Sequence, residues 1–305
     1  MVAIVPRSGT FAGFPGLPVR DRIFFDRRVL PVYGIIAIAG LVVSAAIASG
    51  AFDYDRELFG TTGFALAFFL ALCFPARWLG FAGLAGIAES ILLFLTVAIL
   101  MPFCAVILAT SNLPIADPAL SAIDRALFGF DRHAFVASVA AASPGFIRAM
   151  IWVYNSLTVQ PFLLLAILFL TRRAVRAWTL LTAWSCALAL CVAVSALVPA
   201  YGTPPYALEF IAVLDGARDG SLRLLAAPAL TGIVTFPRFH AAGAAMLAWG
   251  FHGLPGGRAM IALNAVMVVS ALFVGGHYLI DLIAGLGVAA AAIWGAKRMQ
   301  ARLVR

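Results

Sequence analysis

The sequence predicts an all-α fold, a polytopic membrane bundle of about eight transmembrane helices with a six-helix core. Of its 305 residues, 64% are apolar and only 11% are charged, and the mean hydropathy is +1.04. A soluble domain is nearer half apolar and a quarter charged, so this chain has too few polar residues to cover a surface in water. The net charge of +8 comes from arginines placed between apolar runs, which favours membrane orientation and phospholipid contact over nucleic-acid binding.

Eight apolar runs are the candidate spans, because roughly 20 apolar residues in a helix cross the hydrocarbon core. They cover residues 30–51, 58–76, 82–110, 150–171, 177–199, 239–252, 259–275 and 276–295. The sixth is short, so we expect it to be tilted or extended by the residues before it. Only the stretch from Pro75 to Leu79 separates the second span from the third, so the boundary between them is not sharply defined.

The segments between the spans divide the chain into five parts. These are a cytoplasmic lead-in (1–29), N-terminal spans of which we expect the third to join the core (30–110), an extracytoplasmic interfacial segment (111–149), the catalytic spans (150–295) and a cytoplasmic basic tail (296–305). The charge distribution supports this division. With the amino terminus placed inside, 14 of the 21 Lys and Arg residues fall in inside segments and 7 in outside segments.

Basic residues are retained on the cytoplasmic side of a membrane. We therefore expect a multi-pass protein of a bacterial inner membrane with both termini cytoplasmic. The segment 111–149 then lies outside. Its amphipathic run Pro118–Val139, with acids at Asp117 and Asp124, predicts a helix lying in the membrane interface.

Two of the four histidines occupy matching places in this topology. His240 begins the sixth span and His277 the eighth, so both lie at the same face of the membrane. Each is presented at a helix amino terminus, where free backbone N–H groups favour an anion, and the pair Gly275-Gly276 permits a tight reversal. For His133, in an Asp-Arg-His loop, and His252, at a cytoplasmic helix end, a solvated surface position is the better interpretation.

Asp281 follows His277 by four residues, which places its carboxylate on the same helix face, about 6 Å along the axis. It can accept the proton of one ring nitrogen and leave the other free to attack; the alternative is a helix-capping acid near the interface. Glu89 is the only other acid well inside a span, where a snorkelling or helix-pairing role is the better interpretation. The four cysteines lie in apolar runs and are interpreted as inert fillers.

Two motifs carry a family resemblance. Phe236-Pro237-Arg238-Phe239-His240 and Gly276-His277-Tyr278-x-x-Asp281-x-x-x-Gly285 resemble the second and third signatures of the type 2 phosphatidic acid phosphatase superfamily. They are most similar to its inositol phosphorylceramide synthase-like branch. The resemblance covers roughly residues 150–295, with a looser similarity at Asp117–Asp131.

The resemblance implies a covalent mechanism. In that family the third-signature histidine attacks phosphorus and forms a phosphohistidine, the second-signature histidine protonates the leaving oxygen, and the aspartate orients the nucleophile. Carried over to this chain, His277 is the nucleophile, His240 the general acid and Asp281 the orienting residue. The implied partners are a phospholipid substrate and the lipid bilayer, with no nucleic acid, no cofactor and no metal.

The chain departs from the family at its basic residues. The first signature, a lysine and an arginine before proline, is absent, and its nearest counterpart is Tyr201–Tyr206. The arginine of the third signature is replaced by Ala271, whereas Arg238 stands where the second signature usually has serine. Arg238 is the candidate replacement ligand for phosphate and Arg223 a distant second; the alternative for Arg238 is an interfacial contact with lipid headgroups. The aromatic candidates for substrate binding are Tyr201, Tyr206 and Tyr278.

The leading interpretation is an integral membrane lipid phosphotransferase that moves a phosphoryl or phospho-alcohol group from a phospholipid donor to a lipid or alcohol acceptor. With water as the acceptor, the same half-reaction gives a lipid phosphate phosphatase. A transporter would need polar groups at the bilayer midplane, whereas the ionisable residues here gather at one face. A non-catalytic scaffold stays an alternative because two family arginines are missing. No HExxH or GxSxG sequence points to a metalloprotease or a serine protease.

Overall fold

The structure is a computed structural model that describes residues 27–129, 132–203, 208–227 and 233–303. The first six helices in these ranges are α1 (Leu30–Ala48), α2 (Arg56–Trp78), α3 (Ala82–Ala109), α4 (Asp117–Phe128), α5 (Arg132–Ala142) and α6 (Pro144–Asn155). The next six are α7 (Gln160–Leu170), α8 (Ala174–Leu197), α9 (Leu208–Asp219), α10 (Phe239–Phe251), α11 (Gly257–Val274) and α12 (Leu279–Leu303). The minor elements are the 3-10 turns η2 (Arg27–Val29) and η3 (Ser156–Thr158) and the parallel strands β1 (Asp53–Tyr54) and β2 (Leu224–Leu225).

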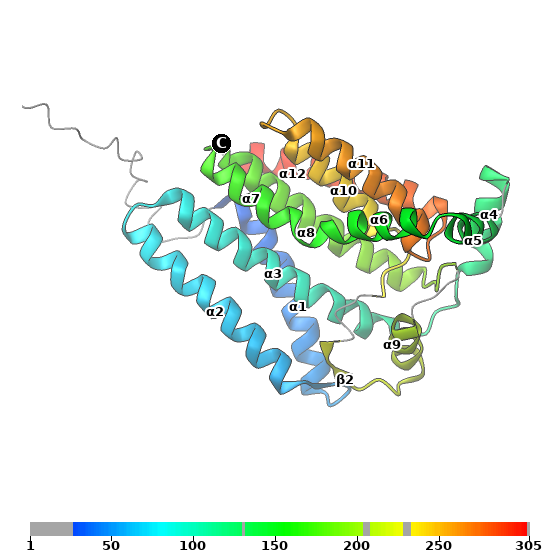
Figure 1. The fold of residues 1–305 in the computed structure, drawn as a ribbon. Helices are drawn as coiled ribbons and strands as arrows, with labels where there is room; N and C mark the ends of the chain where they lie inside the picture. The colour runs from blue at the N-terminus through cyan, green and yellow to red at the C-terminus, as the bar shows by residue number, and fades with distance from the viewer. Residues whose placement is uncertain (1–26, 130–131, 204–207, 228–232, 304–305) are drawn as a thin grey trace, which may run out of the picture.

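A central bundle is formed by α3, α7, α8, α10, α11 and α12 (Figure 1). Within it α10 packs against α7, α8, α11 and α12, while α1 crosses α3 and α8, and α2 packs on α3. Buried leucines such as Leu164 and Leu181 fill the interior, and large apolar side chains such as Phe64 and Trp78 cover the outside. An apolar exterior of this extent belongs in lipid. The predicted all-α polytopic membrane bundle is confirmed.

Fewer of the described helices than the expected eight are long enough to span a membrane. Among the described residues, six helices are long and apolar enough to cross a membrane, or seven if the bent pair α5–α6 counts as one span. The predicted span 150–171 is divided into α6, η3 and α7, with Pro161 at the start of α7, where its missing N–H does no harm. The predicted span 239–252 is α10, whose 13 residues cover about 20 Å of a hydrocarbon core roughly 30 Å thick. Residues 233–238 are not helical, so the expected extension is absent.

The boundary between the second and third spans lies later than the sequence indicates. α2 continues through Pro75 and ends at Trp78; the proline removes one backbone N–H donor, and the helix ends within a turn of it. Residues 79–81 then reverse the chain into α3, with Gly80 in the left-handed region at φ +79. The two helices form a tight hairpin.

This hairpin contains a buried ion pair. The carboxylate of Glu89 in α3 accepts a hydrogen bond from Arg77 in α2 and another, at 2.9 Å, from the hydroxyl of Tyr33 in α1. Glu89 is fully buried and Arg77 is nearly so. The helix-pairing interpretation of Glu89 is confirmed. Arg77, which counted as an orientation signal in the sequence, is instead part of the packing between the first three helices.

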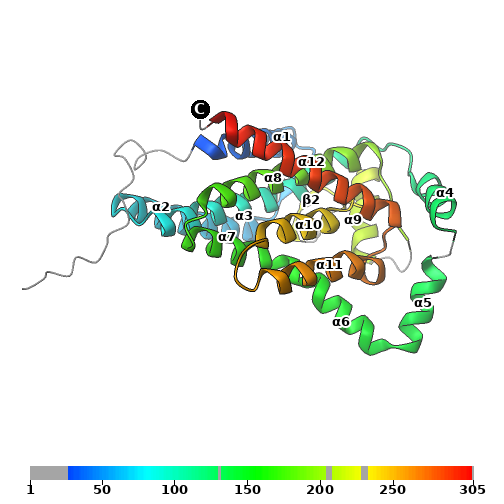
Figure 2. The same ribbon diagram turned by 90° about the horizontal axis from the view of Figure 1, so that it is seen from above.

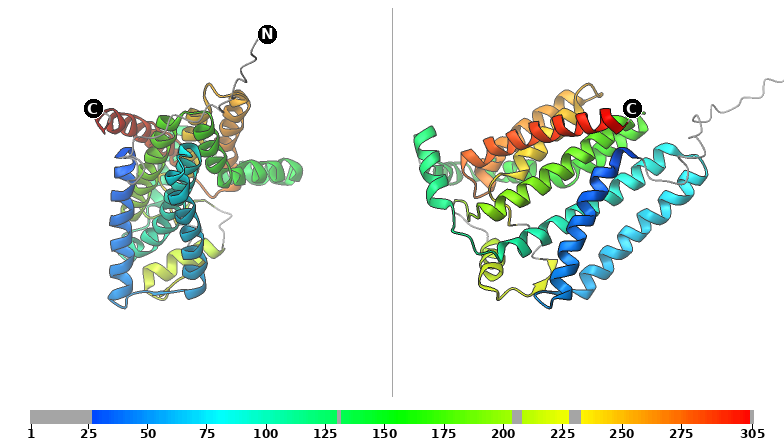
Figure 3. Two further views of the ribbon diagram at one scale, coloured as in Figure 1. Left: turned by 90° about the vertical axis from the view of Figure 1, so that its left-hand side faces the viewer. Right: turned by 180° about the vertical axis from the view of Figure 1, so that it is seen from behind.

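The described ends of the chain meet at one end of the bundle, where the amide of Gln300 donates to the carbonyl of Arg28 at 2.7 Å. The opposite end carries α4, α5, α9 and the start of α12 (Figure 2). The run Pro118–Val139 is not one helix but two, because Gly129 ends α4 in the left-handed conformation at φ +66. We call α4 and α5 the end-cap helices. The helices α5 and α6 form an arm with a bend of 112°, green in Figure 3, which packs against α11 through α6.

Candidate active site

His277 lies in the turn between α11 and α12, at the end of the bundle that α4 and α9 cover. The backbone N–H of Thr203 donates to the carbonyl of Gly276 in this turn at 2.9 Å. Gly202 has φ +90, and a methyl group there would lie 1.8 Å from the same carbonyl oxygen. A methyl group on Gly276 would in turn lie 2.4 Å from the carbonyl oxygen of Thr203. Glycine at both positions lets the two segments meet backbone to backbone, and His277 is left only 6% exposed.

Asp281 faces His277 from the first turn of α12. Its carboxylate is fully buried, and Oδ2 lies 3.8 Å from Nδ1 of His277. That separation is too long for a hydrogen bond, and Oδ2 instead accepts from the backbone N–H of Tyr278 at 2.9 Å. Nδ1 of His277 and Oδ1 of Asp281 are buried without a hydrogen-bond partner among the described residues. The side chains of His277 and Asp281 are therefore close, as predicted, but they are not hydrogen-bonded to each other.

His240 lies in the first turn of α10, and its imidazole stacks on the ring of Tyr154 from α6. The starts of α10 and α12 are joined, because the backbone N–H of Arg238 donates to the carbonyl of Asp281 at 3.0 Å. Gly285 permits this approach, since a methyl group there would lie 2.2 Å from the carbonyl oxygen of Arg238. The structure therefore brings the two histidine motifs together, as the topology predicted.

The guanidinium of Arg238 lies beside both histidines. It donates to the hydroxyl of Tyr154 and to the carbonyl of Val234 at 3.2 Å, and its buried Nε has no partner in the described part of the chain. Burial holds the pKa of His277 well below its ordinary value, and the neighbouring Arg238 and His240 lower it further. The His277 imidazole is therefore neutral at neutral pH, which is the form that can attack.

A second arginine, Arg132 at the start of α5, is unexpectedly part of the same region. Its side chain is 7% exposed and donates to the hydroxyl of Thr203 and the carbonyls of Leu272 and Gly275, the last at 2.6 Å. Arg132 was not among the predicted site residues, and the solvated position predicted for its neighbour His133 does not apply to it. The side chain of His133 lies outside the described residues. His252 is exposed, as predicted.

The amino terminus of α12 is occupied by an acid of the chain itself. Asp124 of α4 accepts from the backbone N–H groups of Leu279 at 2.8 Å and Ile280 at 2.9 Å. The expectation that free N–H groups at both helix starts would bind an anion is therefore wrong for α12. No side chain caps α10, so the amides of its first turn stay available to an anion.

The tyrosine hydroxyls predicted to contact substrate are bound to acids. Tyr201 donates through its hydroxyl to Asp215 of α9, and Tyr278 donates to Asp117 of α4 at 3.0 Å. Asp117 also accepts from the backbone N–H groups of Tyr201 and Gly202, each at 2.8 Å. These contacts show the two tyrosines and Asp117 holding loop segments together at the site end of the bundle.

The remaining predicted site residues lie elsewhere. Tyr206 falls outside the described residues. Arg223 has an exposed side chain next to β2, where its carbonyl accepts from the N–H of Asp53 at 2.6 Å, and the structure does not bring it to the histidines. Among the described residues, no group of three His, Cys, Asp or Glu side chains could hold a metal ion. A metal-independent reaction stays a prediction.

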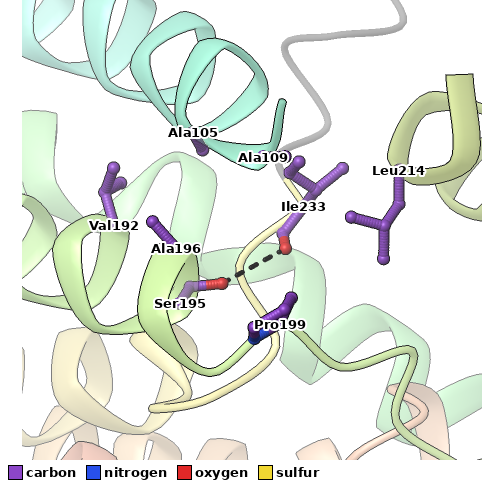
Figure 4. Close-up of a pocket in the computed structure, with 8 residues that line it drawn as sticks. All are labelled: Ala105, Ala109, Val192, Ser195, Ala196, Pro199, Leu214 and Ile233. Atoms are coloured by element: carbon purple, nitrogen blue, oxygen red, sulfur yellow. Dashed lines mark hydrogen bonds between the residues drawn. The ribbon is translucent and has the colours of Figure 1, made fainter. Parts of the chain in front are cut away.

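A small cavity lies between α3, α8 and α9 (Figure 4). Its lining is mainly small and apolar, and the hydroxyl of Ser195 donates across it to the carbonyl of Ile233 at 3.5 Å. It has room for about one water molecule, which is too little for a lipid chain. Neither histidine lines it, so it is not the reaction site.

Comparison with known proteins gives a match at family level. A family model described as the PAP2 superfamily matches residues 118–295, which is more than half of the 305 residues. The match begins in α4, so it includes both end-cap helices as well as the range 150–295 that the sequence motifs indicated. No curated protein and no solved structure gives a significant match.

Proposed function

The chain belongs to the PAP2 superfamily, and from this premise we propose that it is a membrane lipid phosphotransferase acting through a phosphohistidine. The family supplies the phosphatase-type activity; the lipid donor, the acceptor and the intermediate are the proposal. The observation that carries it is a group of buried polar atoms without partners among the described residues. These atoms are His277 Nδ1, Asp281 Oδ1, Arg238 Nε and Arg132 Nε. Such atoms are rare in folded proteins, and four of the seven found among the described residues belong to the starts of α10 and α12 and to the side chain that holds the turn before α12.

The reaction has two half-steps at one phosphorus atom. His240 has to take up a proton as the anionic substrate binds beside it. Nε2 of neutral His277 then attacks phosphorus, the bond to the leaving alcohol oxygen breaks, and protonated His240 donates its proton to that oxygen. Asp281 faces Nδ1 and stabilises the charge that develops on the ring; their 3.8 Å separation has to shorten when substrate binds. An acceptor hydroxyl then attacks phosphorus, gives its proton to His240 and displaces His277.

The negative charge of the phosphate is held by Arg238 and by the open amides at the start of α10. Ala271, where the family has arginine, is fully buried in a cluster with Ala241 and Leu282, and Tyr154 packs against this cluster. The hydroxyl of Tyr154 is also the acceptor of Arg238. Arg238 thus contacts a side chain that packs on the cluster around position 271, which supports a relocated phosphate ligand.

The burial of His277 favours an alcohol acceptor over water, because a site closed to bulk water limits hydrolysis of a reactive intermediate. The apolar exterior of the bundle supports a donor that reaches the site from the bilayer. The resemblance to the inositol phosphorylceramide synthase-like branch points in the same direction. A lipid phosphatase would share the first half-step and differ only in the acceptor.

The proposal can be tested with purified protein reconstituted in vesicles of phospholipid whose phosphate is radiolabelled. Quenching in alkali should trap label on the wild-type protein, because the P–N bond of phosphohistidine survives alkali and is lost in acid. His277→Ala should carry no label and release no product, whereas His252→Ala, exposed at the other end of the bundle, should behave as wild type. Label that moves to an added alcohol indicates transfer, and free phosphate alone indicates hydrolysis. Unchanged turnover by His277→Ala would overturn the mechanism.

A further inference from the structure

We propose that the end-cap helices α4 and α5 position the nucleophile, with Arg132 as the central residue of a positioning frame. The frame consists of Asp117, Asp124 and Arg132, which belong to neither signature motif. The inference rests on the proposed role of His277 and extends it to residues far away in sequence. Each of the three side chains contacts the turn between α11 and α12 or the segment packed on it.

Arg132 holds the turn on its α11 side. The guanidinium donates to the carbonyls of Leu272 and Gly275, and the backbone N–H of His277 donates to the same Gly275 oxygen at 2.8 Å. A further donation goes to the hydroxyl of Thr203, whose own N–H also holds the turn. The buried side chain of Arg132 therefore joins α5 to the Thr203 segment and to the turn. Arg132 and Gly275 are 143 positions apart in the sequence.

The two acids hold the turn on its α12 side. Asp124 accepts from the backbone N–H groups of Leu279 and Ile280, and Asp117 accepts from the hydroxyl of Tyr278. The three residues that follow the nucleophile are thus each held by a carboxylate of α4. Hydrogen bonds from a helix amino terminus to a carboxylate are charge-assisted and stronger than neutral ones.

The placement of the imidazole depends on this frame, because Nδ1 of His277 makes no hydrogen bond of its own among the described residues. The guanidinium of Arg132 is directed to carbonyl and hydroxyl oxygens of the protein, which makes it a positioning residue. Misplacement of a reacting group by about 1 Å can lower a rate about 100-fold. The loss of Arg132 should therefore reduce kcat and leave KM almost unchanged.

Arg132 also acts on the ring through its charge. The charged and titratable groups that face His277 are Arg238 and His240 from α10, Arg132 from α5 and Asp281 from α12. Burial first, and then the cationic groups, hold the pKa of His277 low. Protonated His277 cannot attack, so a higher pKa moves the loss of activity on acidification to a higher pH. Removal of the Arg132 charge should raise that pKa.

Two substitutions in the full-length protein, reconstituted in phospholipid vesicles, separate these effects. Arg132→Gln should lower kcat about 100-fold with little change in KM, and it should move the acid limb of kcat/KM to higher pH. Arg132→Lys keeps the charge and loses the planar fork, so it should lower kcat while the acid limb stays in place. Arg125→Gln, on the exposed face of α4, is the matched control and should retain wild-type kinetics.

Hydrogen–deuterium exchange gives a readout that does not depend on turnover. In Arg132→Gln and Asp124→Asn, the peptide covering residues 275–281 should exchange faster while the rest of the bundle is unchanged. Wild-type kcat and an unmoved acid limb in Arg132→Gln would refute the inference even if His277→Ala is inactive. The inference would also be refuted if kcat of Arg132→Gln fell only in proportion to the amount of folded protein. If the wild type traps no phosphohistidine, the proposed function fails instead, and the exchange data still decide whether the frame holds the turn.

Discussion

The phenol ring of Tyr154 lies parallel to the imidazole of His240, with ring centroids 4.1 Å apart and an interplanar angle of 9°. The hydroxyl of the same ring accepts a hydrogen bond from Arg238. One side chain of α6 therefore contacts both the proposed general acid and the proposed phosphate ligand.

Aromatic stacks contribute about 0.5–1.5 kcal/mol, so Tyr154→Ala should lower kcat roughly 2- to 12-fold in steady-state assays.

The hydroxyl and the ring of Tyr154 can be tested apart. Tyr154→Phe keeps the stack and loses the contact with Arg238, so it should raise KM more than it lowers kcat. Trp152→Ala, on the same helix and 80% exposed, is the control for changes in α6. Equal kinetics of the Phe and Ala variants would show that the stack makes no contribution.

The role of His240 can be tested with a donor whose leaving group needs no proton. His240→Ala should lower turnover of phospholipid donors by about 10²- to 10⁴-fold. With p-nitrophenyl phosphate, the nitrophenolate leaves unprotonated, so phosphoenzyme formation should stay close to the wild-type rate. Rapid-quench measurements with both donors check this. A loss of the same size with both donors would assign His240 a role other than proton donor.

Arg238 should account for a large part of phosphate binding. A hydrogen bond to a charged group contributes about 1.5–3 kcal/mol, so Arg238→Ala should lower kcat/KM roughly 10- to 150-fold. Arg238→Lys should recover only part of this, because a point charge lacks the bidentate fork. Arg148→Ala, exposed on α6, serves as the control. Near-normal efficiency of Arg238→Ala would reduce Arg238 to a contact with lipid headgroups.

The orientation of the bundle can be read from two exposed positions. Ser221 lies just after α9, at the site end of the bundle, and Arg258 lies in the first turn of α11, near the opposite end. With the site end outside the cytoplasm, a cysteine at position 221 should react with an impermeant thiol reagent in intact cells, and one at position 258 should not. The native cysteines are buried or half-buried, which keeps the background low. The reverse labelling pattern would invert the orientation.

The sequence predicts most helices well, because lipid imposes both a length and an apolar composition on a span. The runs at 82–110 and 177–199 correspond closely to α3 and α8. The short run 239–252 also matches α10 to within one residue. Whether residues before it extend the helix could not be predicted, because packing against four other helices decides its length. The arm α5–α6 is likewise beyond prediction, since the sharp bend between its helices is a tertiary feature and the apolar pattern continues through it.

Part of the site could also be predicted from the sequence. His277 and Asp281 are one helical turn apart, and the topology alone brings His240 to the same end of the bundle. Arg132 and Tyr154 could not be found in this way, because their partners lie 143 and 84 positions away. An arginine in a polar loop reads as a surface residue until the tertiary contacts that bury it are known.

The buried pair of Arg77 and Glu89 has a consequence for biosynthesis. Glu89 lies two turns into α3, and a charged side chain inside a span is costly to insert unless it is paired. The two residues are 12 positions apart on either side of a short turn, so α2 and α3 can leave the translocon as one hairpin with their charges already neutralised. We expect Arg77→Leu, which leaves Glu89 unpaired, to lower the inserted fraction in a cell-free translation assay, and addition of Glu89→Leu to restore it. Poor insertion of the double variant would contradict this coupling between the two helices.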